Sequence, residues 1–461
     1  MSTSTRLQAM KPTDVGVPGP TSWDMARAFR SVRADPISFL ADVAEQYGDL
    51  VSFPVPGPPA LLANDPADVR HVLQTSARHW GKQTVQYAAL ARVTGPGLLA
   101  SSEPSWIEHR RLAAPAFHHE RLAAVGEQVR AAADAAVVGR LGRVTSPELV
   151  DVAALTHRIG LDSVGRALFS ADLSGQAQWL LDATSEAATL VVRLGRSVLP
   201  TATWAPTPTN VRLRSTRRRL DASCADLVAQ RRRRAGASAA APHGDDLLGL
   251  LLDSGLSDAE VRDELVTMVI AGHETVAAAL AWTLMLLAED QPAQERVRAE
   301  LAAHPGPVPL LGHRESLPWT RAVVDEALRL YPPAWVVSRR STRADVVGGR
   351  VVPPGTLVIV SPWLVHRRSD AWPDPSAFRP DRFLGAGATV PAYLPFGQGP
   401  RLCIGREFAL GEMVVVLSRV LTAYRLDVPP GWTRPVPEAK VAVHPRGGMP
   451  LVVTPLDTGR A

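Results

Sequence analysis

The stretch FGQGPRLCIG at residues 396–405 is a glycine-rich loop that carries one cysteine, Cys403. A run with helical character follows it, from Arg406 toward Tyr424. A thiolate is a soft ligand for iron, and nearby positive charge or a helix N-terminus helps to keep it ionised. Arg401 and the expected helix supply both features. The alternative is a cysteine that only packs in a loop.

The spacing F-x-x-G-x-R-x-C-x-G is matched by Phe396, Gly399, Arg401, Cys403 and Gly405. This pattern resembles the haem-ligand loop of the cytochrome P-450 superfamily. The resemblance implies that Cys403 is the axial ligand of a haem b iron. It also implies that the other four residues contribute to the haem site, with Arg401 reaching a haem propionate.

A long apolar helix is predicted to begin at a capping box formed by Ser257 and Glu260 and to run to about Asp290. Its residues are apolar nearly all round, so we expect it to lie in the core. The pentapeptide AGHET, residues 271–275, interrupts this run with a histidine and a glutamate. Buried polar groups are costly unless they are paired, so the interruption indicates a functional site.

The same pentapeptide resembles the oxygen-activation motif of the superfamily. The resemblance implies that Glu274 relays protons and that Thr275 hydrogen-bonds dioxygen. It also implies that Ala271 and Gly272 leave room for a diatomic ligand. The alternative is a helix kink with a threonine that bonds to its own backbone.

Two further groups are expected to hold the haem propionates. Trp106 and Arg110 lie four residues apart on the predicted helix Ser105–Ala114, so an indole N–H and a guanidinium share one face. This pair resembles the propionate-binding pair of the superfamily, although a packed tryptophan beside a surface arginine is the alternative. Arg339, favoured over Arg340, resembles another propionate-binding arginine.

A structural brace is expected from Glu326 and Arg329 on the helix at 318–331, together with Arg382 in the segment FRPDRF, residues 378–383. These residues resemble the buried ion pair and its partner segment in the superfamily, here with an aspartate where glutamate is usual. The resemblance implies that they hold the cysteine loop. Alone, E-x-x-R is equally typical of an exposed helix pair.

The other histidines and glycines show no H-E-x-x-H motif, no Cys/His quartet and no nucleotide-binding loop. Flavin and nicotinamide are therefore expected on separate proteins. His366 could lie near the haem edge or be a satisfied core histidine.

Composition is that of a soluble globular protein, with 46% hydrophobic and 21% charged residues among 461. No linker divides the chain, so a single domain over residues 1–461 is expected. Cys224 and Cys403 are too few for a disulfide framework. The longest near-apolar run, 276–288, is shorter than the roughly 20 residues of a membrane span. These features predict a cytoplasmic protein without a membrane anchor.

The formal net charge of +5 includes arginine runs at 217–219 and 231–234. Basic runs are compatible with nucleic-acid binding. Apolar residues between them instead predict a helix with its arginines in solvent, and no aromatic platform accompanies them. No nucleic-acid partner is expected.

Local patterns predict mostly helices with a few strands. In chain order we expect an irregular lead-in over 1–35, a helix at 36–47, a strand pair from 50–54 and 59–63, a helix at 65–76, an irregular pocket loop over 79–102, helices over 120–235 interrupted at 200–208, a short helix at 245–252, strands at 345–352 and 356–361, and a closing strand pair that includes 451–454.

The resemblance implies a mainly α fold with small β sheets, the triangular single-domain cytochrome P-450 fold, in a monomer. It implies monooxygenation, in which one oxygen atom of O2 hydroxylates or epoxidises a hydrophobic small molecule of secondary metabolism. Electrons would pass from NAD(P)H through a ferredoxin reductase and an acidic ferredoxin that docks near Arg401 and Arg406.

Two alternatives stay open. One is a haem-thiolate enzyme for oxidative coupling, desaturation or peroxide-driven oxidation. The other is a haem sensor or carrier without turnover. Residues 85–99, 266–271, 335–337 and 444–446 are candidates for the substrate pocket. They are mainly apolar, which is typical of sites for terpenoids, polyketides, fatty acids or aromatic compounds.

Overall fold

The computed structural model describes residues 16–170, 177–195, 204–235, 243–244, 246–385 and 390–456. The chain divides into two compact units. The first comprises Met1–Thr84, Trp335–Pro373 and Pro391–Leu402, and the second comprises Val85–Ala334, Asp374–Val390 and Cys403–Ala461. The expectation of one continuous domain stays a prediction.

The first unit is built on a five-stranded sheet with the order β1-β2-β8-β5-β3, in which only the pair β2–β8 is parallel. Short helices and a hairpin of β6 and β7 complete it. Its elements are α1 (Ser22–Ala34), α2 (Pro36–Tyr47), β1 (Leu50–Phe53), β2 (Ala60–Ala63), α3 (Pro66–Arg70), the π-helix η1 (His71–Thr75), η2 (Ala77–His79), β3 (Trp80–Gly81), β5 (Val337–Ser341), β6 (Asp345–Val347), β7 (Arg350–Val352), β8 (Leu357–Val360), α16 (Pro362–Val365) and η7 (Gly399–Arg401).

The expected helix at 36–47 and the strand pair after it are confirmed. The irregular lead-in over 1–35 is wrong for α1, while residues 1–15 lie outside the described part of the chain. The signal for α1 was a capping box, in which Thr21 accepts from the Asp24 N–H and the Asp24 side chain accepts from the Thr21 N–H. No residue of α1 is buried, so it has no core-facing stripe to detect.

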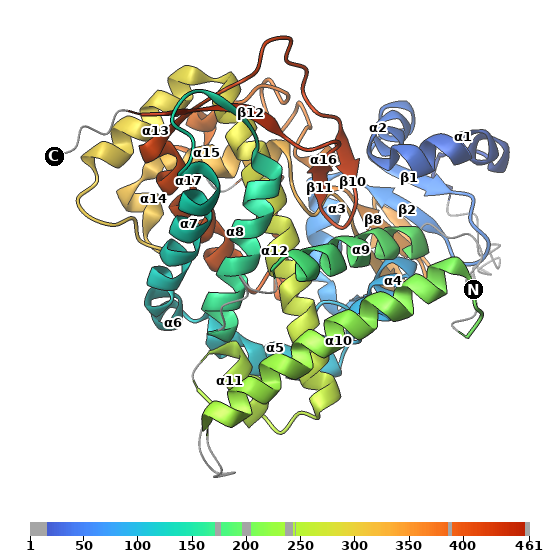
Figure 1. Ribbon diagram of the computed structural model, residues 1–461. Helices are drawn as coiled ribbons and strands as arrows, with labels where there is room; N and C mark the ends of the chain where they lie inside the picture. Colours follow the sequence, from blue (N-terminus) through green and yellow to red (C-terminus); the bar gives the residue numbers. More distant parts are fainter. Residues whose placement is uncertain are drawn as a thin grey trace, which may run out of the picture. The chain divides into compact units, whose positions relative to one another are not determined.

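The second unit consists mainly of helices, with a three-stranded sheet β4-β12-β9 and a two-stranded pair β10–β11 (Figure 1). Its elements are α4 (Val85–Thr94), α5 (Ser105–Ala113), η3 (Ala114–Phe117), α6 (His119–Ala124), α7 (Gly126–Leu141), β4 (Glu148–Asp151), α8 (Val152–Phe169), α9 (Ala177–Gly195), α10 (Pro208–Ala235), α11 (Leu247–Asp253), α12 (Asp258–Glu289), α13 (Gln291–Ala303), α14 (His313–Ser316), α15 (Pro318–Leu330), η5 (Pro380–Phe383), α17 (Arg406–Ala423), β9 (Tyr424–Asp427), β10 (Pro437–Ala439), β11 (Val443–Pro445) and β12 (Pro450–Pro455).

Helix α4 corrects the expectation of an irregular loop over 79–102. Five of its ten residues are buried, and they include Tyr87, Ala89 and Leu90. The exposed Val85 is apolar and the buried Thr94 is polar, so the contrast between the two faces of this helix is weak in the sequence. The expected interruption at 200–208 lies partly outside the described residues, and α10 begins at Pro208.

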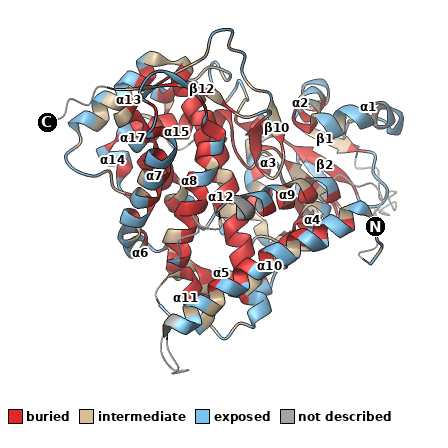
Figure 2. Cartoon of the chain, viewed as in Figure 1, coloured by how far each residue is buried: buried red, intermediate tan, exposed pale blue. Residues whose placement is uncertain are grey.

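Helix α12 forms the core of the second unit, as its sequence predicts. The Ser257 capping box begins it, since the Ser257 hydroxyl accepts from the Glu260 N–H and the Glu260 carboxylate accepts from the Ser257 N–H. Figure 2 shows α12 buried along most of its length. It is long and apolar enough to cross a membrane by composition, but a core helix passes the same test.

Candidate functional site

Cys403 lies at the end of its loop, three residues before α17 begins at Arg406. Its side chain is exposed, whereas Cys224 is buried and burial raises the pKa of the Cys224 thiol to about 12. Gly405 occupies the N-cap position of α17 and provides no side-chain cap. The positive end of the helix is therefore available to stabilise a thiolate at Cys403.

Arg110 is a positively charged residue that interacts electrostatically with Cys403. Burial lowers the pKa of Arg110, and its attraction to the Cys403 thiolate partly offsets this. Trp106 is buried on the same face of α5. Both residues belong to the second unit together with Cys403, and their role in binding a propionate stays a prediction.

Helix α5 is tied to α12 by a buried pair that the sequence analysis missed. His109 is hydrogen-bonded through Nδ1 to Glu264, and the Leu98 N–H donates to Glu264 Oε1 at 2.8 Å. The hydrogen bond to Glu264 raises the pKa of His109 above its usual value. Because His109 lies between Trp106 and Arg110 in sequence, this contact fixes the helix that carries them. In the sequence, the histidine between Trp106 and Arg110 was the one sign of this contact.

The middle of α12 has an accessible face in an otherwise buried helix. Ala271, Gly272 and Thr275 are partly exposed, while His273 and Glu274 between them are buried. The Thr275 hydroxyl donates to the Ala271 carbonyl at 2.7 Å, which is the local bond named as the alternative for this motif. Its oxygen retains the capacity to accept a hydrogen bond.

Gly272 has a packing reason of its own. A Cβ atom at this position would lie 2.9 Å from Val164 Cγ2 on α8, which is closer than real contacts allow. Glycine therefore lets α8 and α12 pack closely. The role of Gly272 in making room for a diatomic ligand stays a prediction.

Glu274 turns toward β11 rather than along its own helix. Its Oε2 atom lies 2.9 Å from His444 Nε2, and the carboxylate is 2% exposed. Burial by itself raises the pKa of Glu274, but the contact with His444 and the neighbouring histidines lower it to about 2. His444, one of the candidates for the substrate pocket, is buried in this contact.

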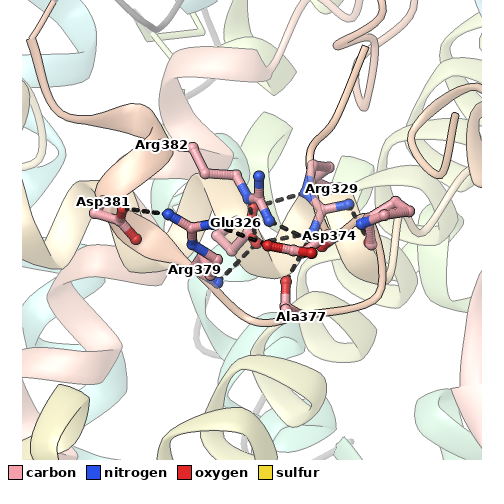
Figure 3. A network of polar contacts seen from close by, with 8 residues as sticks. Glu326, Arg329, Asp374, Ala377, Arg379, Asp381 and Arg382 are labelled. Carbon is pink, nitrogen blue, oxygen red and sulfur yellow. Dashed lines mark hydrogen bonds and ion pairs between the residues drawn. The ribbon is translucent and has the colours of Figure 1, made fainter. Parts of the chain in front are cut away.

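The brace residues Glu326, Arg329 and Arg382 meet as a buried cluster (Figure 3). Glu326 Oε2 accepts from Arg329 Nε at 2.7 Å, and Oε1 accepts from Arg329 Nη2, the Arg379 backbone N–H and Arg382 Nε at 2.8, 2.9 and 3.2 Å. Arg329 also donates to the carbonyls of Pro375 and Ala377. These ion pairs and hydrogen bonds hold α15 to the segment around η5.

The remaining predicted residues lie in the first unit. Arg340 donates to the carbonyls of Gln83 and Gly355, while Arg339, its neighbour on β5, is buried and donates to the Ser338 carbonyl. The role of Arg339 in binding a haem propionate stays a prediction. His366 is fully buried and accepts a hydrogen bond from the Leu394 N–H at 2.9 Å, so it is a satisfied core histidine.

Phe396, Gly399 and Arg401 are all partly buried in the segment of the first unit that precedes Cys403. Gly399 has φ +72°, and a Cβ atom there would lie 2.1 Å from the Leu73 carbonyl oxygen. Only glycine fits this combination of left-handed backbone and close approach. The glycine thus shapes the start of η7, three residues before this segment of the unit ends at Leu402.

The second unit by itself provides donors that fit a haem. Its exposed cysteine lies just before a helix N-terminus, and thiolate is an established haem ligand. Trp106 and Arg110 would hold a propionate. The partly exposed face formed by Ala271, Gly272 and Thr275 would lie against the ring.

Comparison with known proteins gives consistent matches. A family model described as Cytochrome P450 matches residues 17–452. Cyclooctat-9-en-7-ol 5-monooxygenase of Streptomyces melanosporofaciens is 33% identical over 86% of this chain and 86% of its own. Pentalenene oxygenase of Streptomyces avermitilis is 31% identical over 97% of each chain. The crystal structure of CYP175A1 from a strain of Thermus thermophilus matches with a TM-score of 0.75 and 30% identity, covering 94% of this chain and 97% of that one.

Proposed function

This chain belongs to the cytochrome P450 superfamily and is a haem monooxygenase, and from this premise we propose that it oxidises a cyclic terpenoid with Cys403 as the iron ligand. The names of the two Streptomyces relatives state oxygenation of cyclooctat-9-en-7-ol and of pentalenene, both cyclic terpene compounds. The mainly apolar residues 266–271 suit a hydrophobic substrate of this kind.

One observation carries the proposal. The second unit contains both an exposed cysteine at a helix N-terminus and the partly exposed Ala271, Gly272 and Thr275 on a buried helix. A packing cysteine would be buried, as Cys224 is. A sensor or carrier would have little use for a buried acid beside an accessible hydroxyl.

When bound, haem b supplies dioxygen activation with electrons from outside the protein. Trp106 and Arg110 would orient the ring by donating to a propionate. Because the Thr275 hydroxyl donates to the Ala271 carbonyl, its Oγ atom would accept a hydrogen bond from a protonated group at the site where dioxygen reacts. Glu274 Oε1, which has no hydrogen-bond partner among the described residues, is available to pass a proton.

The proposal is tested by screening cyclic terpene hydrocarbons and terpene alcohols for a change in the haem spectrum, followed by turnover of those that bind. Turnover uses NADPH with a surrogate reductase and ferredoxin under labelled dioxygen. We expect a product that contains one labelled oxygen atom. Product formed with peroxide alone, and never with the protein partners, would favour peroxide-driven oxidation. Binding and turnover confined to fatty acids or aromatic compounds would refute the terpenoid assignment.

A ferredoxin is proposed to dock against the basic residues around Cys403. Arg406 is half exposed and is partly neutralised by Glu407, whose Oε1 atom accepts from its Nε at 2.8 Å. We expect Arg406→Ala to slow reduction by an acidic ferredoxin several-fold at low salt and to reduce the dependence of that rate on ionic strength. An unchanged rate and salt dependence would exclude this docking site. Arg419→Ala, also a half-exposed arginine of α17, is the matched control.

A further inference from the structure

Four side chains with metal-ligating atoms lie close together, and Glu274 is one of them. His157 comes from α8, His273 and Glu274 come from α12, and His444 comes from β11. His157 Nδ1 lies 3.1 Å from His273 Nε2, and His444 Nε2 lies 2.9 Å from Glu274 Oε2. One ligand atom each from His157, His273 and Glu274 fall within 4.8 Å of one another. The proposed oxygenation uses only one of these four residues.

Close packing of three elements builds this cluster. Helices α8 and α12 lie side by side (Figure 1), and Gly160 of α8 lies opposite His273, where a Cβ atom would be 3.2 Å from the His273 carbonyl oxygen. Strand β11 is held against α12 by the Trp282 indole, which donates to the Val443 carbonyl at 2.8 Å. The rings of His157 and His444 stack with centroids 5.2 Å apart. The arrangement is therefore part of the packed core.

Polar atoms of this cluster lack hydrogen-bond partners among the described residues. Glu274 Oε1 has no hydrogen-bond partner among the described residues, and His444 Nε2 approaches Glu274 Oε2 without the alignment of a hydrogen bond. Glu274 is 2% and His444 is 7% exposed, so water does not readily replace the missing partners. Buried polar atoms without partners are uncommon and costly. A ligand that engages both atoms would remove that cost.

The protonation states suit a metal ion. Burial lowers the pKa of His157 to about 3 and also lowers the pKa of His273. Both imidazoles are thus neutral near pH 7, while the Glu274 carboxylate, with a pKa of about 2, is ionised. His157 Nδ1 and His273 Nε2 share one hydrogen-bonding proton, which must move to another ring nitrogen before both atoms can bind an ion.

We propose that His157, His273 and Glu274 form a binding site for a divalent transition metal ion such as Zn²⁺, with His444 beside Glu274 as a residue that positions the carboxylate. Two imidazoles and one carboxylate match the preference of zinc for nitrogen and oxygen ligands and leave a fourth tetrahedral position open. Zn–N bonds of about 2.0–2.1 Å place tetrahedral ligand atoms about 3.3 Å apart. The observed separation of 3.1 Å between His157 Nδ1 and His273 Nε2 is close to this value. His157 is partly exposed and provides a path for entry.

Occupancy would have a consequence that rests on the proposed function. An ion that coordinates Glu274 would hold the carboxylate and withdraw it from proton transfer. The site would then be inhibitory, distinct from the iron that Cys403 binds. The binding test below does not depend on turnover, so its failure and a failure of the proposed function are separate results.

Zinc binding is measured on the haem-loaded protein, in which iron occupies Cys403, by equilibrium dialysis against Zn²⁺ and elemental analysis. We expect one tightly bound Zn²⁺ per chain. His157→Ala and His444→Ala should each weaken this binding at least about tenfold. His119→Ala, which removes an exposed histidine of α6, is the matched control and should bind as the unmodified protein does. Thermal unfolding and the haem spectrum establish that each variant is folded.

X-ray absorption at the zinc edge identifies the ligands. The proposal predicts a first shell of nitrogen and oxygen with imidazole scattering and no sulfur. A sulfur shell would assign the ion to a cysteine and overturn the proposal. Binding that is equally strong in His157→Ala, His444→Ala and His119→Ala, or the lack of any bound zinc in the unmodified protein, would overturn it as well.

Discussion

Glu326 and Glu274 are both buried carboxylates in the second unit, yet their surroundings differ. Both oxygens of Glu326 accept hydrogen bonds, from two arginine side chains and one backbone N–H, and the residue is fully buried. Glu274 has one contact, to His444, and an oxygen without a hydrogen-bond partner among the described residues. A charge whose bonds are all used holds a structure together. A charge with unused capacity is suited to chemistry or to ligand binding.

The largest effect is expected from breaking the brace. Arg329→Ala leaves the Glu326 carboxylate buried with only part of its compensation, so we expect a loss of about 3–5 kcal/mol in the free energy of unfolding. Thermal or denaturant unfolding and the yield of haem-loaded protein measure this loss.

Arg379→Ala is the matched control for the brace. Arg379 binds Glu326 only through its backbone N–H, and its exposed side chain contacts the exposed Asp374 and Asp381. Its removal should change stability by no more than about 1 kcal/mol. Equal losses of stability in the two variants would show that the buried network contributes no more than the exposed contacts of Arg379.

Glu274→Gln should produce the opposite pattern. The amide keeps the shape of the side chain but neither carries the charge nor relays a proton, so we expect oxygenation to slow by about 100-fold. Stability should change much less than in Arg329→Ala. Turnover with surrogate redox partners and thermal unfolding measure the two quantities. A variant that unfolds at a lower temperature but oxidises substrate at the normal rate would show that Glu274 has a structural role like that of Glu326.

A third buried carboxyl group, that of Glu412, extends the comparison, and its replacement is expected to have the smallest effect. Glu412 on α17 is fully buried with Ser163 as its polar neighbour, and burial, only partly offset by Ser163, raises its pKa to about 8. Its folded pKa lies above the unfolded value of 4.5, so this group stabilises the fold at low pH in its neutral form. That contribution is lost as the pH rises toward 8.

Glu412→Gln therefore should flatten the decline in melting temperature between pH 5 and about pH 8. The melting temperature of the variant should exceed that of the unmodified protein by a few degrees at pH 8 and by less at pH 5. Melting curves across this range measure it. Parallel pH profiles for the two proteins would show that Glu412 is not neutral in the fold.

Sequence patterns predicted the parts of this site that local physics determines. The capping box at Ser257, the apolar run of α12 and the spacing around Cys403 each involve residues close together in the chain. The histidine cluster could not be predicted in this way. His157 and His273 are 116 residues apart, and His444 joins them only because β11 packs on α12.

Helix α4 shows a second limit. Sequence periodicity identifies a helix by the contrast between its buried and exposed faces. In α4 the buried face carries the small Ala89 and the polar Thr94, while the apolar Val85 is exposed, so hydrophobicity barely distinguishes the two faces. Packing against neighbouring helices, and not local preference, accounts for this element.

The central claim is that Cys403, and not Cys224, binds the haem iron. The most direct test is the absorption spectrum of the reduced carbon monoxide complex of the unmodified protein, Cys403→Ser and Cys224→Ser. We predict a thiolate-type Soret band in the unmodified protein and in Cys224→Ser, whose cysteine is buried in the core, and its loss in Cys403→Ser. A thiolate-type band that persists in Cys403→Ser would contradict the account.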